Sequence, residues 1–282
     1  MIVTDVPVRT GDCWLIPGDI HFDKQDDDAL EIMLQVAETQ QVNGCILIGD
    51  TFDSAGISRH GRPARNFRDG KGTIAAERAA ALPILRTIVG IVKSNRRAAH
   101  QPTGGLHCLT GNHCAWWDAV QDDYPGFLDT QWWELYGDLF DHWHMHGEST
   151  ALKLGRLLVT HGHRLRGSLS KHSASAVLAN YPGQNTLYGH THRVDSCITP
   201  TYKYGQPVDH GAWTIGHMRD IHVELQDKFL GPHAERHKQG FALVHFMNVQ
   251  GDVVFDVEQV LIRRTPDGRP YAMRGTALYG PY

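Results

Sequence analysis

Five short segments of the chain carry histidine, aspartate and asparagine side chains of the kinds that bind metal ions. In chain order they are Asp19–His21, Gly49–Asp53, Gly111–His113, Thr160–His163 and Gly189–His192. Each segment follows a run of apolar or β-branched residues, so each stands where a strand should end. Because strand ends meet at one edge of a sheet, side chains far apart in sequence can converge there. Imidazole nitrogen and carboxylate oxygen suit divalent cations, so the segments predict a metal centre.

Asp50 is the residue best suited to hold two cations together. Ions ~3.5–4 Å apart repel each other, and a shared carboxylate offsets that repulsion. Gly49 precedes Asp50 and would let backbone and substrate approach closely. A single buried histidine is more often a hydrogen-bonded core residue than a ligand, so the prediction depends on the ordered set of segments.

The ordered set resembles the calcineurin-like metallophosphoesterase superfamily, whose motifs run DxH, GDxxD, GNH followed by an acidic residue, H and GHxH. The match extends from Asp19 to His192 and fills every ligand position. The resemblance implies an α/β fold, a four-layer αββα sandwich with mixed parallel and antiparallel sheets. It also implies hydrolysis of a phosphate ester by a hydroxide that bridges two divalent metal ions. Mn²⁺ is the expected ion, and Fe, Zn²⁺ and Ni²⁺ suit the same ligands.

Carried over to this sequence, the resemblance implies seven metal ligands in two sets that share Asp50. The first set is Asp19, His21 and His192, and the second is Asn112, His161 and His190. His113 resembles the catalytic histidine, which protonates the leaving oxygen or stabilises charge in the transition state. Asp53 resembles the carboxylate that orients this histidine.

Cys114 departs from the family pattern, which has an acidic residue at this position. We expect Cys114 to be neither a ligand nor a nucleophile. The change should alter the hydrogen bonds around the site without abolishing catalysis. An oxidisable thiol beside the site is the alternative.

Three residues near the motifs are candidates for contact with substrate: Arg59, His60 and His163. The first two follow the second motif in a glycine-rich loop and could reach a phosphate, although an ordinary surface loop explains them equally well. His163 lies two residues beyond the predicted ligand His161. Further along, His142, His144 and His146 share one face of an extended segment, for which a solvent-facing strand is favoured over a metal site.

Charge is unevenly distributed along the chain, whose net charge is −4. Residues 55–105 hold ten of the 27 Lys and Arg residues but only two of the 31 acidic residues. Such a segment suits a phosphate-rich substrate, although a solvated helix face with a basic loop explains it about as well. Aromatic residues between 116 and 143 could stack bases. The preferred substrate is therefore a phosphodiester of a nucleic acid or nucleotide.

Other functions stay open at this stage. A phosphomonoesterase acting on a small molecule or a phosphoprotein is one alternative, although the Arg-Gly that follows GDxxD in phosphoprotein phosphatases is missing here. A non-catalytic scaffold with the same fold is the alternative of another class. Such relatives usually lose a ligand or the catalytic histidine, and this chain has both.

The apolar patterns predict one domain over residues 1–282, with a basic helical and loop insert at about 55–105 and an aromatic-rich insert at about 115–147. Strands are expected at 13–17, 45–48, 106–109, 151–160 and 186–188, and a hairpin at 241–249 and 252–262. A helix should follow Asp26–Asp28, which suit its N-terminal end. A second helix is expected at 73–98, kinked or divided at Pro83. Early strands should be parallel, with antiparallel strands added later.

The five cysteines are scattered and form no CxxC pair, so neither a disulfide framework nor a zinc ribbon is indicated. No stretch approaches the roughly 18 apolar residues that a membrane helix needs. The N-terminus has no apolar signal-peptide core. These observations predict a cytoplasmic protein without a membrane partner, and they leave its oligomeric state open.

Overall fold

Two six-stranded sheets, packed face to face, form the centre of the molecule. The computed structural model describes residues 1–55, 73–102, 105–123, 130–203, 206–226 and 236–281. In the first sheet the strand order is β12-β11-β2-β3-β4-β5, and in the second it is β1-β6-β7-β8-β10-β9. A small third sheet contains β13, β14 and β15.

The first sheet has a parallel centre with antiparallel strands added on one side, as predicted. Its parallel strands are β2 (Cys13–Pro17), β3 (Gly44–Leu47), β4 (Leu106–Leu109) and β5 (His144–His146). The hairpin of β11 (Gly240–Val249) and β12 (Asp252–Leu261) joins β2 in antiparallel orientation. The predicted hairpin near the C-terminal end of the chain is therefore confirmed.

The second sheet is mixed. It contains β1 (Ile2–Val6), β6 (Thr150–Leu154), β7 (Leu157–Thr160), β8 (Asn185–Tyr188), β9 (Asp195–Lys203) and β10 (Gln206–Thr214). The prediction of one strand over 151–160 was wrong, because β6 and β7 form an antiparallel hairpin there. Gly155 has a positive φ of 59°, which suits a tight turn between the two strands.

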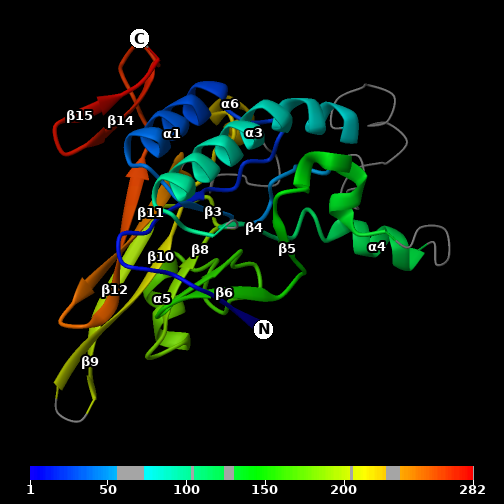
Figure 1. Cartoon of the computed structure of the whole chain (residues 1–282). Coiled ribbons are helices and arrows are strands. Elements are labelled where there is room, and N and C mark those ends of the chain that lie inside the picture. Colours follow the sequence, from blue (N-terminus) through cyan, green and yellow to red (C-terminus); the bar gives the residue numbers. More distant parts are fainter. Residues whose placement is uncertain (56–72, 103–104, 124–129, 204–205, 227–235, 282) are drawn as a thin grey trace.

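Helices cover the outer faces of both sheets and complete four layers, which confirms the predicted αββα class. Over the first sheet lie α1 (Asp27–Thr39) and α3 (Ile74–Ala98), side by side in Figure 1. Their apolar residues share one core cluster with Leu15, Cys45 and Cys108 of that sheet. On the other side, α5 (Ser173–Asn180) packs on Tyr188 and Ala212 of the second sheet.

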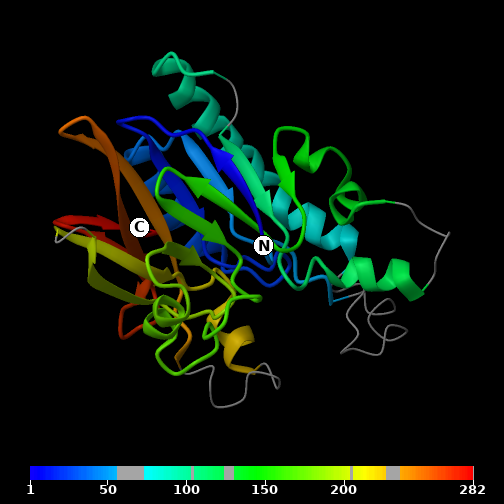
Figure 2. The same ribbon diagram turned by 90° about the horizontal axis from the view of Figure 1, so that it is seen from below.

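The space between the two sheets is filled by a separate apolar cluster, which includes Trp14, Ile46, Leu152 and Leu187. Burial on both faces explains why the central strands read as continuous apolar runs. In the views of Figures 1 and 2 the hairpins β9–β10 and β11–β12 extend to the same side of the molecule.

Both predicted helices are present, and Pro83 does not divide the second one. The side chain of Asp26 caps α1 by accepting a hydrogen bond from the Ala29 amide at 3.0 Å. Helix α3 continues through Pro83 as one element. Ala81 and Leu85, on either side of the proline, are buried in the same core cluster, and this packing offsets the lost backbone hydrogen bond.

The remaining elements are short. They are α4 (Trp116–Asp123), the 3₁₀ helix η2 (Trp132–Phe140), α6 (Ile221–Gln226), β13 (Arg263–Arg264), β14 (Pro270–Arg274) and β15 (Ala277–Tyr279). The extents of the two predicted inserts stay predictions, and residues 56–72 of the basic one lie outside the described part of the chain. No described helix is both long and apolar enough to cross a membrane.

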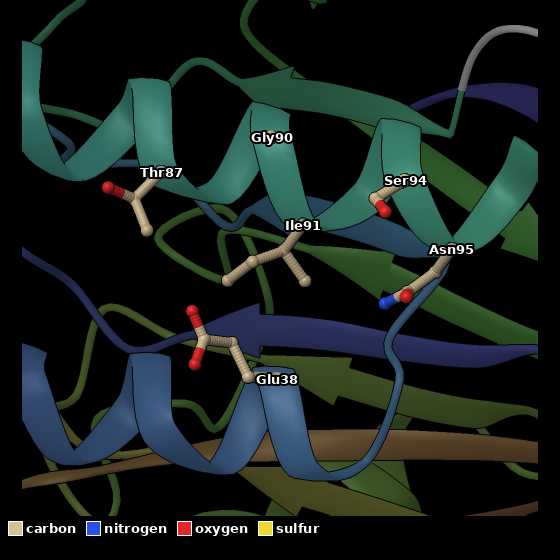
Figure 3. Close-up of a pocket in the computed structure, with 6 residues that line it drawn as sticks. All are labelled: Glu38, Thr87, Gly90, Ile91, Ser94 and Asn95. Carbon is tan, nitrogen blue, oxygen red and sulfur yellow. The ribbon is translucent and has the colours of Figure 1, made fainter.

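A hollow in the surface lies between α1 and α3. It is lined by Glu38 of α1 and by Thr87, Gly90, Ile91, Ser94 and Asn95 of α3, as Figure 3 shows. None of these residues belongs to the five motifs, so this hollow carries none of the predicted chemistry.

Candidate metal centre

The five motif segments begin where strands of both sheets end. Asp19, Asp50 and Asn112 follow β2, β3 and β4 of the first sheet, and His161 and His190 follow β7 and β8 of the second. Each of these two groups of strands is parallel, so its strands end at a common edge. The side chains therefore approach one another across the junction of the two sheets.

His161 brings the second predicted ligand set together. Its Nε2 lies 3.3 Å from Asp50 Oδ2 and 3.0 Å from Asn112 Oδ1. One ligand atom each from Asp50, His161 and His190 lie within 4.8 Å of one another. These residues could hold a metal ion between them.

His192 does the same for the first set. Its Nε2 lies 3.4 Å from Asp19 Oδ2 and 3.3 Å from His21 Nε2. His21 Nε2 lies 4.0 Å from Asp50 Oδ2, which links this set to the other. All seven residues predicted as ligands thus lie together, with Asp50 between the two sets, while their role as ligands remains a prediction.

The backbone is strained at four of these seven residues. His21, Asp50, His190 and His192 have φ values of 52°, 43°, 67° and 54°, in the left-handed region. Each such conformation costs about 1–3 kcal/mol and persists only where surrounding contacts impose it. Strain concentrated on four neighbouring polar side chains is typical of a functional site.

Glycines of one motif leave space for the carboxylates of another. A Cβ atom added to Gly111 would lie 2.1 Å from Asp50 Oδ1, and one added to Gly189 would lie 2.4 Å from Asp19 Oδ1. Any side chain at either position would collide with a predicted ligand. The glycines in the motifs are therefore required by close approach at the centre.

The electrostatics of the centre suit cations. Burial alone would raise the pKa of Asp50, but His161 and His113 hold that pKa well below its usual range. Burial lowers the pKa of His21 to about 4 and that of His190 to about 3. These two imidazoles are therefore neutral near pH 7, which is the form that binds metals. Burial opposes charge on His161 and His192 too, but Asp50 raises the pKa of His161 and Glu224 raises that of His192 to about 10, so a metal ion would displace a proton from His192.

One buried atom lacks a partner that a cation would supply. Asp19 is fully buried, and its Oδ1 has no hydrogen-bond partner among the described residues. A buried carboxylate oxygen left unpaired is costly. Together with the mixed imidazole, carboxylate and amide donors, this unpaired oxygen shows that the residues fit divalent metal ions.

His113 lies beside Asp53. Its Nδ1 lies 2.7 Å from the main-chain oxygen of Asp53 and 3.8 Å from the carboxylate of that residue. The Asp53 carboxylate also lies 3.2 Å from His21 Nδ1 and bonds to Lys24. The carboxylate is thus shared among three groups, and its role in orienting His113 stays a prediction.

Two residues of the site were missed from the sequence, Lys24 and Glu224. Lys24 stands three residues after His21, a spacing that could have suggested it. Glu224 of α6 accepts a hydrogen bond at 2.6 Å from His192 Nδ1. It stands 32 residues from His192, and nothing in the sequence indicates that they meet.

The structure describes one of the three candidate substrate residues, His163. Arg59 and His60 lie outside the described residues. His163 contacts Glu148 at 3.1 Å and lines a cavity of about 340 Å³ beside His161, with Thr110, Arg164 and Tyr181 among the other lining residues.

The other residues singled out from the sequence lie around this region. His142 and His144 are exposed, whereas His146 is half-buried against His107. Burial raises the pKa of the Cys114 thiol well above its usual range. A protonated, buried thiol is a poor nucleophile.

Comparisons with known proteins add little to this geometry. No protein-family model and no curated protein matches the chain. Among solved structures, a double mutant of Vps29 from Entamoeba histolytica matches with 12% sequence identity and a TM-score of 0.36, over 88% of this chain and 98% of that one. At this TM-score the similarity establishes neither a shared family nor a function.

Proposed function

We propose that this protein is a phosphoesterase of the calcineurin-like metallophosphoesterase superfamily that works with two divalent metal ions. The main support is that the seven predicted ligands, from five distant segments, lie together with Asp50 between the two sets. Strained backbone at four of them and an unpaired oxygen on Asp19 support the same conclusion. Asp19, His21 and His192 would hold one ion, Asn112, His161 and His190 the other, and Asp50 both.

Two divalent ions, expected to be Mn²⁺, would act at such a site as Lewis acids that activate water and the phosphoryl group. The protein would position them through the seven predicted ligands. Asn112 contributes a neutral oxygen, so the centre keeps less negative charge than a carboxylate there would give. A phosphate ester, itself an anion, is then repelled less.

His113 is proposed as the general acid. Because the Asp53 carbonyl oxygen can only accept, His113 Nδ1 donates the hydrogen bond between them. The nitrogen left for proton transfer is Nε2. Protonated there, His113 would hand its proton to the leaving oxygen of the ester. The Asp53 carboxylate, which lies 3.8 Å from His113 Nδ1 and also contacts His21 and Lys24, would help to orient this histidine.

We propose a phosphodiester of a nucleic acid or nucleotide as the substrate. The half-buried ring of Trp116 lies with its centroid 4.1 Å from that of His113, and an aromatic ring at this position could stack a base. Lys24, also half-buried, places a cationic group beside Asp53 at the same site. We further propose that the cavity lined by His163 receives part of the substrate.

The test uses bis-p-nitrophenyl phosphate and p-nitrophenyl phosphate with the protein loaded with Mn²⁺. Faster turnover of the diester supports a phosphodiesterase, and a panel of oligonucleotides, cyclic nucleotides and phosphosugars then narrows the substrate. Inactivity on both compounds with metal bound, repeated with Zn²⁺ and Ni²⁺, would contradict the proposal and favour a non-catalytic scaffold.

A further inference from the structure

One stretch of the chain carries positive charge without any acidic residue. Residues 149–194, which include the last two motifs, hold six Lys and Arg residues and no Asp or Glu, although the net charge of the whole chain is −4. Three of the six lie in residues 161–172, the segment that joins β7 to α5 and is called the basic loop from here on: Arg164, Arg166 and Lys171. This loop begins at His161, one of the predicted ligands. A concentration of positive charge therefore starts at the metal centre.

The basic loop is held in place by its neighbours. The side chain of Leu165 is buried in the apolar cluster of α5. The Tyr181 hydroxyl accepts a hydrogen bond from the Arg166 amide at 3.2 Å, and Arg193 Nη1 donates one to the Ser170 carbonyl oxygen at 2.8 Å. A loop with this support presents its side chains without first having to become ordered, which lowers the cost of binding a ligand.

The start of the basic loop lies against two predicted ligands. The ring centroid of His163 lies 5.2 Å from that of His161 and 6.0 Å from that of His190. Glu148 Oε1 lies 3.1 Å from His163 Nε2 and accepts a hydrogen bond from Arg164 Nε at 3.2 Å. Contacts therefore run without a break from the predicted ligands to the Arg164 guanidinium.

The charges of two further cations in the basic loop are not offset. Glu148 neutralises Arg164, to which it is bonded. Burial lowers the pKa of His163, so its ring is neutral near pH 7. Arg166 and Lys171 are exposed, and neither is ion-paired with another residue that the structure describes. Exposed arginine and lysine side chains are common partners of phosphate groups.

The cavity of about 340 Å³ beside His161 connects the metal centre with the basic loop. It is lined by His161, His163, Arg164 and Tyr181, together with several serine and threonine residues. Hydroxyl groups and an arginine suit the sugar and phosphate of a nucleotide, and a tyrosine ring in the wall is a surface on which a base can stack. A cavity of this volume suits one nucleotide unit and is too small for a duplex.

We infer that the basic loop binds backbone phosphates next to the scissile one through Arg166 and Lys171, and that the substrate is a single-stranded polynucleotide rather than a cyclic nucleotide or another small diester. The inference rests on the proposed function, since it places the scissile phosphate at the metal centre. A small diester has no further phosphate that reaches the loop, so only a strand gains affinity there.

The experiment compares the double variant Arg166→Gln/Lys171→Gln with the unchanged protein, both loaded with Mn²⁺. Fluorescence anisotropy at several KCl concentrations follows the binding of a labelled phosphorothioate oligothymidylate, which keeps the backbone charge and resists hydrolysis. Each phosphate contact with a single strand contributes about 0.7 to the slope of log affinity against log salt, so the double variant should lower the slope by about 1.4. Between about 50 and 200 mM KCl, the unchanged protein should then lose about sevenfold more affinity than the variant.

A second strand distinguishes RNA from DNA, which share the phosphate chemistry. A phosphorothioate oligouridylate is titrated in the same way. A lower slope in the double variant with either strand supports the inference, and the strand with the larger change is the one that the loop holds better.

Steady-state kinetics separates binding by the loop from the chemistry at the centre. In the double variant KM for an ordinary oligonucleotide should rise about tenfold at low salt, and kcat should stay the same. Turnover of bis-p-nitrophenyl phosphate should not change, because this diester has no neighbouring phosphate.

Lys153→Gln/Arg156→Gln is the matched control. Both residues are exposed cations of residues 149–194, but they lie on β6 and in the turn before β7, near the end of β7 that is opposite His161. The control changes the net charge by the same amount as the loop variant. Its salt slope should equal that of the unchanged protein, since the position of the charge matters and not its sum.

Four results would overturn the inference. They are an unchanged salt slope in the loop variant, an equal change in the control, equal affinity for a polyglutamate of the same charge, and an equal rise in KM for bis-p-nitrophenyl phosphate. Melting temperatures check that both variants fold, and Lys171→Gln alone should lower the slope by about 0.7 if the double variant does not. Absence of hydrolysis of every diester would contradict the proposed function itself, whereas hydrolysis with an unchanged salt slope would contradict only the inference.

Discussion

Two buried acidic regions lie next to each other in this protein, and their surroundings differ. One is the metal centre, where Asp19 keeps an unpaired oxygen and histidines lie on every side. The other is the Glu77 junction, defined as Glu77 of α3, Ser54 and Tyr136. There Oε1 accepts from the Ser54 amide and Oε2 from the Tyr136 hydroxyl, both at 2.6 Å.

The buried carboxyl groups of the two regions differ in their ionisation. Burial raises the pKa of Glu77 to about 8, whereas neighbouring histidines hold the pKa of Asp50 well below its usual range. Glu77 is therefore largely neutral near pH 7, and Asp50 is charged among imidazoles. Burial alone does not indicate a metal site; a buried carboxylate oxygen without a partner, among several histidines, does.

The largest expected effect is that of Asp50→Asn, which tests the bridging role in the centre. An amide oxygen carries no charge to offset repulsion between two cations. We expect at least one ion to be lost and ester hydrolysis to fall below detection. Elemental analysis after loading with Mn²⁺ measures the stoichiometry. Two ions at full occupancy would contradict the bridge.

His113→Ala should separate proton transfer from metal binding within the centre. Because His113 is not among the predicted ligands, we expect both ions to remain. Turnover should fall by roughly two to four orders of magnitude, the usual range for loss of a general acid. Steady-state kinetics with bis-p-nitrophenyl phosphate measures it, and unchanged turnover would remove His113 from the mechanism.

The two regions also differ in how far the sequence predicts them. The motifs are local, because each contains its strand end, its glycine and its ligand within a few residues. The Glu77 junction and the Glu224–His192 contact join residues that are far apart, and no periodicity indicates them. The hairpin β9–β10 was missed for a related reason: its edge strand exposes Ile198 and Tyr202 and contains Pro200, so it has no apolar run.

The motif also does not predict which groups share the Asp53 carboxylate with His113. A family motif specifies which residues are present, but His21 and Lys24 compete for the same carboxylate. Competition of this kind depends on rotamers and on packing. The sequence therefore predicts the ligands of the centre better than the contacts behind them.

Glu77→Gln tests, through the pH dependence of stability, whether Glu77 is protonated in the folded protein. Below its ordinary value of 4.5, Glu77 is protonated in both the folded and the unfolded chain. Between pH 4.5 and about 8 only the unfolded chain releases the proton, so the stability of the fold should fall by up to about 1.4 kcal/mol per pH unit. Above about 8 both states are ionised and the decline should stop.

The glutamine variant does not ionise, so it should lack this part of the decline. Urea unfolding at several pH values between 4.5 and 8 measures the difference. Glu31→Gln, an exposed change on α1, is the control and should keep the decline of the unchanged protein. The same slope in Glu77→Gln and in the unchanged protein would show that Glu77 ionises normally in the fold.

Tyr136→Phe is the smallest change and tests whether the junction is independent of the metal centre. It removes the hydroxyl that Glu77 Oε2 accepts from, but it keeps the ring, which stacks on Phe52 with centroids 3.7 Å apart. An unsatisfied buried acceptor costs about 1–3 kcal/mol, so the free energy of unfolding should fall by that amount. The loss should grow above pH 8, where Glu77 is ionised and a buried carboxylate without a donor is more costly.

Mn²⁺ binding by Tyr136→Phe, measured by calorimetry, should stay the same, because neither Tyr136 nor Glu77 reaches the predicted ligands. A shift in Mn²⁺ affinity would show that the Glu77 junction and the metal centre are energetically coupled and do not act independently.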